Sequence, residues 1–149
     1  MGTSSEYIQL PGSIVQLRLR QYHVTVKKGI YFKNSTYDGL TKLDYCIIEY
    51  AGETNNANVY FNSAAPTITN TTISNSSSHG IYFAIGSPTI ANSSLNDNDL
   101  YPISTNPNDC SNFSSNTASG NGIANSIQIR GGRVVRASLE PVRVRQRRV

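Results

Sequence analysis

A repeated stretch in the middle of the chain restricts the fold more than any other feature of the sequence. The letters "NVYF" at 58–61 return as "GIYF" at 80–83, which is 22 residues later. The same offset carries "PTITNTTI" at 66–73 onto "PTIANSSL" at 88–95. Because two separate landmarks share one interval, and internal periods of roughly 20 to 50 residues are typical of repeat architectures, the sequence predicts an array of stacked units.

Two further copies extend this series, one upstream at "GIYF" (29–32) and one downstream at Ile103, so the spacings are 29, 22 and 22 residues. Within each copy the apolar letters alternate with others, which predicts a short strand with one buried face. The predicted inward residues of this first strand are Ile30 and Phe32, Val59 and Phe61, Ile81 and Phe83, and Ile103.

Two more short strands follow in each copy, separated by Gly, Pro, Asn and Ser residues that favour turns. The predicted inward positions of the second strand are Leu43 and Tyr45, Ile68 and Asn70, and Ile90 and Asn92. Those of the third strand are Ile48, Ile73 and Leu95. Each turn of about 22 residues therefore holds three brief strands, and one turn cannot bury its apolar side alone.

Stacked turns of this kind form three parallel sheets around a shared interior, with neighbouring strands about 4.7–4.9 Å apart. Matching residues then lie above one another, so we expect an aliphatic ladder and a phenylalanine ladder. Asn70 and Asn92 are predicted to point inward as a short amide ladder at a bend. Leucine-rich arrays need a leucine and asparagine frame, and propellers need about 40 residues per blade, so neither repeat fold fits.

Composition is consistent with an all-β domain. A chain of 149 residues is long enough to bury a core as one domain, and its 38% hydrophobic and 15% charged residues separate it from disordered chains. Cys46 and Cys110 match no metal or redox spacing, so we expect buried free thiols. No apolar run is long enough to span a bilayer, and the first residues show no secretory signal pattern.

The segments "GIYF…LDYCIIEYAG", "PTITNTTISNSSSHGIYF" and "NSIQIRGG" resemble bacterial right-handed parallel β-helix repeat proteins of the pectate-lyase-like superfamily. The resemblance covers residues 28–132 and implies a short, single-stranded, right-handed parallel β-helix of about four to five coils. Residues 1–27 are predicted to add strands or a cap. The resemblance implies an extracellular or cell-surface location, but that superfamily hosts many activities and fixes none.

Positive charge is concentrated at the C-terminus. Six arginines lie within residues 131–149, whereas residues 1–130 carry seven basic and eight acidic groups. A basic arm can contact phosphates, but this one has no interleaved aromatic residues and no nucleic-acid motif. We therefore expect no nucleic-acid partner, and we expect the tail at 133–149 to be poorly ordered or foreign to the native domain.

Three residues are weak candidates for catalysis. Asp97 and Asp99 in "NDND" could form an acid pair or a calcium site, although an Asx-rich turn explains them as well. The stretch "SHGIYFAIGS" is similar to a polygalacturonase segment. This similarity implies that His79 is a functional residue. The paired aspartates of that family are missing from the preceding turns, so we expect His79 to be a turn residue.

Lyases of this superfamily combine calcium-binding carboxylates with a basic residue on one face. One early turn holds Lys33, Lys42, Asp38 and Asp44, but no carboxylates are predicted to stack above them. We therefore expect no catalytic set, no resident metal and no cofactor other than a possible calcium ion.

Tyr31, Tyr60 and Tyr82 share one outward phase of the repeat, so they are predicted to stack as a column of phenols. Aromatic faces pack on the apolar faces of sugars, and Asn62 together with Asn34 and Lys33 could hydrogen-bond the rim. The column is thus a predicted glycan-binding site. Alternatively, adjacent tyrosines only stabilise the sheet, each pair contributing about 0.5–1.5 kcal/mol beyond burial.

These features favour a non-enzymatic module of a secreted or surface protein that binds a polysaccharide or cell-surface glycan, or that serves as an adhesive or structural spacer. The alternative is a fragment of a polysaccharide lyase or glycoside hydrolase that acts on polyuronates. Because the ends of a short solenoid present unpaired strand edges, self-association through those ends is also expected.

Overall fold

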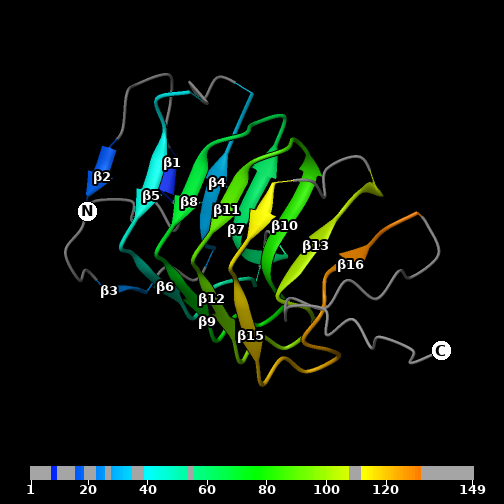
Figure 1. The fold of residues 1–149 in the computed structure, drawn as a ribbon. Helices are drawn as coiled ribbons and strands as arrows, with labels where there is room; N and C mark the ends of the chain where they lie inside the picture. The colour runs from blue at the N-terminus through cyan, green and yellow to red at the C-terminus, as the bar shows by residue number, and fades with distance from the viewer. Residues whose placement is uncertain are drawn as a thin grey trace, which may run out of the picture.

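The chain coils into three parallel β-sheets in the computed structural model, which Figure 1 shows as a ribbon. The described residues are 8–9, 16–18, 23–25, 28–34, 39–53, 56–107 and 112–131. Successive strands pass to the three sheets in turn, so every third strand along the chain returns to the same sheet. The result is a β-solenoid of about four turns, as the repeat predicts.

Sheet A, the first of the three, has the order β1-β4-β7-β10-β13-β16. Its strands are β1 (Ile8–Gln9), β4 (Ile30–Phe32), β7 (Ala57–Asn62), β10 (His79–Ile85), β13 (Ile103–Thr105) and β16 (Gln128–Ile129). Sheet B consists of β2 (Gln16–Arg18), β5 (Lys42–Asp44), β8 (Thr67–Thr69), β11 (Thr89–Ala91) and β14 (Phe113–Ser114). Sheet C consists of β3 (His23–Thr25), β6 (Ile47–Glu49), β9 (Thr72–Ser74), β12 (Ser94–Asn96) and β15 (Thr117–Ser119).

The register between coils is the one that the sequence offsets predict. In sheet A, Ile30 pairs with Val59, Val59 with Ile81 and Ile81 with Ile103. In the other two sheets the strand centres of adjacent coils also pair, as Ile68 does with Ile90. The vertical stacking of equivalent letters is therefore confirmed.

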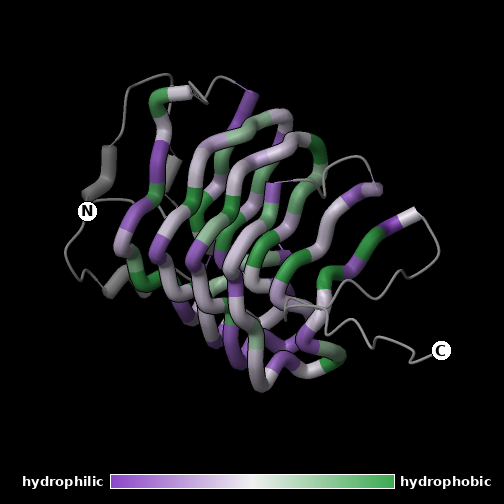
Figure 2. The backbone as a smooth tube through the Cα atoms, in the orientation of Figure 1, coloured by the Kyte–Doolittle hydropathy of each residue, from purple (hydrophilic) through white to green (hydrophobic). Residues whose placement is uncertain are grey.

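The hydrophobic core fills the space between the three sheets. Phe32, Phe61 and Phe83 are fully buried and stack with ring centroids 5.1 and 5.0 Å apart. Figure 2 shows the hydrophobic segments of neighbouring coils lying beside one another along the solenoid. This agrees with a core made of one aliphatic or aromatic ladder per inward position, rather than of side chains brought together from unrelated loops.

Two rows of left-handed residues make the bends on either side of sheet C. The row between sheets B and C is Tyr45, Asn70, Asn92 and Ser115, with φ angles of 55°, 50°, 51° and 54°. The row after sheet C is Tyr50, Asn75, Asp97 and Gly120, with φ angles of 60°, 52°, 53° and 66°. Asn and Gly tolerate this conformation better than other residues, so the repeat places them there.

These bends correct the predicted inward positions at the end of the second strand. Tyr45 is 63% exposed, Asn92 is exposed and Asn70 is only half-buried, so the inward amide ladder predicted for Asn70 and Asn92 is wrong. The alternation that orients a strand stops at these residues, because each adopts a left-handed φ that turns the chain. The residue after each bend is the one that points inward.

Inward residues after the bends form two polar ladders. In the first, the Cys46 amide donates to Thr71 Oγ1, the Thr71 amide to Ser93 Oγ and the Ser93 amide to Asn116 Oδ1. In the second, the amides of Ser76 and Asn98 donate to Oδ1 of Asn98 and Asn121, respectively. Buried backbone amides at the bends are thereby satisfied by the next coil.

The cysteines, the C-terminal segment and the possibility of a membrane span were also addressed by the sequence. Cys46 is buried, as expected, whereas Cys110 and the tail at 133–149 lie outside the described residues. Ile127, which precedes β16, is buried in the core. Within the described part of the chain, no helix has the length and apolar character to cross a membrane.

Candidate functional site

The predicted column of tyrosines lies on the outer face of sheet A. Tyr31, Tyr60 and Tyr82 pair in register on β4, β7 and β10. Their ring centroids are 5.0 and 5.2 Å apart, and the rings are nearly parallel, with interplanar angles of 25° and 10°. The sequence therefore placed these three residues correctly relative to one another.

The flat faces of these rings are covered. Each tyrosine packs on its neighbour, Lys33 Nζ lies 5.7 Å from the centre of the Tyr31 ring, and the Arg130 guanidinium lies 3.8 Å from the centre of the Tyr82 ring. A ligand would therefore meet ring edges and phenol oxygens, not aromatic faces. Hydrogen bonding, rather than stacking on a sugar face, is the interaction that this column can offer.

Arg130 is the residue of this site that sequence analysis missed. It follows β16 by one position, its side chain crosses β13, and its Nη2 donates to the Phe83 carbonyl and, at 3.4 Å, to Asn106 Oδ1. Burial lowers the pKa of its guanidinium, while Tyr60 acts in the opposite direction. The signal that could have found it is its phase, because Arg130 shares the outward phase of Gln128 and therefore lies on the same face as the tyrosines, two strands from Tyr82 with β13 between.

Asn62 lies beside the tyrosine column and stabilises it. Its Nδ2 donates to the Tyr31 hydroxyl at 2.9 Å, which ties the neighbouring coils together across the outer face. Burial raises the pKa of Tyr60, and Tyr31 adds to that rise while Arg130 opposes it. The Tyr60 phenol thus stays protonated and is able to donate a hydrogen bond.

His79 lies next to the column, in a strand and not in the turn that we predicted. It begins β10 because its amide donates to the Asn56 carbonyl of the previous coil, at 3.1 Å. The imidazole is only 7% exposed and lies against the rings of Tyr82 and Tyr101, at centroid distances of 5.7 and 6.0 Å.

Two effects keep this imidazole neutral. Burial, and then the charge of Arg130, lower the pKa of His79 to about 4, although a hydrogen bond with the Tyr101 backbone acts in the opposite direction. Its Nδ1 atom is buried without a hydrogen-bond partner. His79 is therefore a neutral group with one unused acceptor, and it cannot serve as a general acid near pH 7.

The acidic candidates are separated from the column. Asp97 is an exposed bend residue of sheet C, and Asp99 is exposed in the loop that follows it. Within the residues that the structure describes, no group of three or more His, Cys, Asp or Glu side chains gathers where it could hold a metal ion.

The lyase-type cluster of the early turn is divided between sheets. Lys42 Nζ lies 3.1 Å from Asp44 Oδ2 on sheet B, whereas Lys33 faces outward beside Tyr31, and Asp38 lies outside the described residues. Burial alone would raise the pKa of Asp44, but hydrogen bonds from Thr69, Asn70 and Lys42 hold it below the usual range. This carboxylate is engaged within the fold.

Comparisons with known proteins give no match: no protein-family model, no curated protein and no solved structure is similar to this chain. The fold and the geometry of its surfaces therefore carry the functional argument.

Proposed function

We propose that this solenoid is a non-enzymatic, glycan-binding module of a secreted or surface protein, and that it binds acidic polysaccharides through the outer face of sheet A. The observation that carries the proposal is the column of three phenols with a cation at each end, Lys33 beside Tyr31 and Arg130 beside Tyr82. The resemblance to pectate-lyase-like β-helix proteins supports a polysaccharide as the partner, and it supports the extracellular location.

The charge of this face favours a polymer that carries carboxylates. The described side chains that point outward from sheet A include Lys33 and Arg130 and no acidic group. Neither cation has a carboxylate partner among the described residues. A polyuronate would supply the missing anions, since charge-assisted hydrogen bonds to carboxylates are stronger than neutral ones.

The repeat itself suits a polymer. Phenol oxygens recur in three consecutive coils, with the Asn62 amide beside that of Tyr31, so equivalent hydroxyl groups follow the solenoid axis at the spacing between strands. An extended polysaccharide also repeats its hydroxyl groups along its length. Several weak contacts can then act together, although each is modest alone.

Affinity gel electrophoresis in polygalacturonate tests this proposal. The gel should retard the wild-type protein, and the double variant Tyr60→Phe/Tyr82→Phe should lose roughly tenfold or more in affinity, because it loses two hydroxyls of about 1 kcal/mol each and keeps the stacked rings. Lys33→Gln and Arg130→Gln should weaken retardation, more so at low salt. Lys42→Gln is the control that removes one positive charge from sheet B.

Two results would contradict the proposal. If wild-type protein migrates freely in polygalacturonate, or if the tyrosine double variant binds as tightly as the wild type, the column is only a structural element of the sheet. Release of unsaturated or reducing sugars from the same polymer, with or without calcium, would instead establish the enzymatic alternative.

A further inference from the structure

The two bends that flank strand β6 carry tyrosines where the next three coils carry Asn, Ser, Asp or Gly. Tyr45 precedes the strand and Tyr50 follows it, with φ angles of 55° and 60°. The equivalent residues of the next three coils are Asn70, Asn92 and Ser115 at the first bend, and Asn75, Asp97 and Gly120 at the second. This coil therefore differs at both of its bends from the three coils that follow it.

This departure is unfavourable for the backbone. A left-handed φ is uncommon for any residue with a side chain, and bulky residues adopt it less readily than Asn, Asp or Gly. The coil that follows turns with asparagine at both equivalent positions, so the bend geometry itself does not need a tyrosine. Backbone strain that the fold does not need, at two matched positions, points to a role for the side chains.

These two rings are open to solvent, in contrast to those of sheet A. Tyr45 is 63% exposed and Tyr50 is 55% exposed. Across the described residues, neither ring stacks on another ring or lies under a cation, whereas Tyr31, Tyr60 and Tyr82 are covered on their faces. Open aromatic faces are the surfaces on which the apolar faces of sugars pack.

The outer face of sheet C between and beyond these tyrosines is a regular array of polar groups. Outward residues of the following three strands are Thr72 and Ser74, Ser94 and Asn96, and Thr117 and Ser119. They bond to one another between coils, as Thr117 Oγ1 does to Ser94 Oγ at 3.3 Å and Ser119 Oγ to Asn96 Oδ1 at 3.0 Å. Hydroxyl and amide groups thus recur at every coil.

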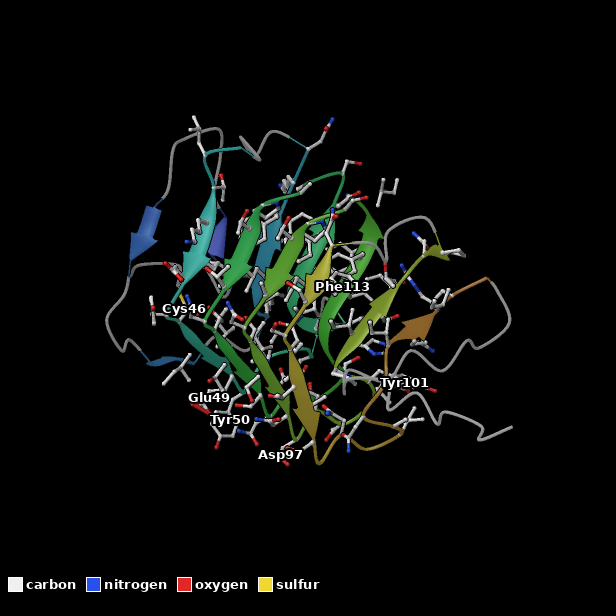
Figure 3. All side chains as sticks on the ribbon, viewed as in Figure 1. Cys46, Glu49, Tyr50, Asp97, Tyr101 and Phe113 are labelled. Carbon is white, nitrogen blue, oxygen red and sulfur yellow. The ribbon has the colours of Figure 1, made fainter. Side chains whose placement is uncertain are left out.

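The described charges of this face are opposite in sign to those of sheet A. On the described outward residues of sheet C and its two bends, the charged groups are Glu49 and Asp97, and no basic side chain is among them. Asn75 Nδ2 donates to Glu49 Oε2 at 3.2 Å, which holds that carboxylate beside Tyr50. Figure 3 shows Glu49, Tyr50 and Asp97 along the same edge of the molecule.

We propose that Tyr45 and Tyr50, together with the polar array of sheet C, form a second binding site that takes an uncharged polysaccharide chain. The open rings supply stacking surfaces and the hydroxyl and amide rows supply hydrogen bonds. The two carboxylates repel phosphate and uronate polymers. The five-residue separation places the two Cα atoms at most about 18 Å apart, a span that several sugar units cover.

The test replaces both tyrosines with the residue that the neighbouring coils use. In gels that contain hydroxyethyl cellulose, xyloglucan or galactomannan, at least one neutral polymer should retard the wild-type protein. The double variant Tyr45→Asn/Tyr50→Asn should lose at least tenfold in affinity, while its melting temperature rises because the bends are relieved of strain. Its retardation by polygalacturonate should not change.

Two further variants keep this result interpretable. Tyr60→Phe/Tyr82→Phe should retain full binding to the neutral polymer. Loss of binding at the sheet A column can then be distinguished from loss of binding at Tyr45 and Tyr50. Glu49→Gln/Asp97→Asn should keep the neutral ligand and reduce the repulsion of polygalacturonate from this face. The proposal is overturned if none of the three neutral polymers retards the wild type, or if the Tyr45→Asn/Tyr50→Asn variant binds as the wild type does.

Discussion

The guanidinium carbon of Arg130 lies 3.8 Å from the centre of the Tyr82 ring, and this contact closes one end of the tyrosine column. The next coil offers Ser104 at the equivalent position, whose small side chain donates to Gln128 Oε1 at 2.7 Å. The Arg130 guanidinium thus stacks on Tyr82 at the place where the next coil has Ser104 and no aromatic ring. Such stacking on an aromatic ring is particularly favourable for the planar side chain of arginine.

Replacing Arg130 should change the titration of His79. Because the Arg130 charge lowers the pKa of His79, Arg130→Ala is expected to raise that pKa from about 4 toward the ordinary value of 6.5. Proton NMR of the imidazole during a pH titration measures the shift. Arg130→Lys, which keeps the positive charge, should leave the pKa low, and equal values in the wild type and Arg130→Ala would contradict the assignment.

Stability should fall between pH 6.5 and pH 4. The unfolded chain takes up a proton on His79 near pH 6.5, whereas the folded chain resists it until about pH 4. Protons therefore favour the unfolded state in this window, and the loss is at most about 3 kcal/mol for a depression of this size. Urea unfolding at several pH values measures it, and His79→Gln should flatten the slope across that window.

Sequence offsets were enough to predict the architecture. The 22-residue interval between Val59 and Ile81 fixed which residues stack, because a solenoid repeats its contacts at the period of its sequence. The bends were predicted less well. In the sequence, Asn70 and Asn92 continue the alternation of the preceding strand. In the structure, a left-handed φ at each residue turns its side chain away from the core. The alternation of apolar and polar residues does not reveal such a change in φ.

Asn116→Ala should destabilise the coil that precedes it. Asn116 is 3% exposed, accepts from the Ser93 amide at 2.9 Å and donates to the Ile90 carbonyl at 2.8 Å. Loss of the side chain removes both bonds and takes the acceptor away from the buried Ser93 amide, at a cost of about 1–3 kcal/mol. Hydrogen exchange of the Ser93 amide should accelerate, whereas the exposed control Ser119→Ala should change stability by less than about 0.5 kcal/mol.

Gly29→Ala should be more damaging than an ordinary surface change. Gly29 has a φ of +81°, and a Cβ atom there would lie 2.5 Å from the Asn58 carbonyl oxygen and 2.7 Å from that of Ala57. The backbone strain alone costs about 1–2 kcal/mol, and the clash adds to it. Thermal unfolding should show a clear loss, whereas Gly39→Ala, which meets nothing within 4 Å, should be neutral or slightly stabilising.

The candidate site was predicted in part. The phase of the repeat aligned Tyr31, Tyr60 and Tyr82, but it did not show that the rings cover one another's faces, because that depends on side-chain rotamers at a spacing close to 5 Å. Arg130 went unnoticed because its side chain reaches back over β13 to the coil of Tyr82, a contact that a comparison of equivalent positions does not reveal.

The ladders that join each coil only to the next one also set how the molecule would respond to mechanical force. A coil such as the one between Val59 and Ile81 adds 22 residues of chain but only about 4.8 Å of axial length. When pulled from its ends, the solenoid would give way coil by coil from the outermost one. Each step would release about 75 Å of extended chain, so a short module of this kind can absorb a large extension before its central coils are disturbed.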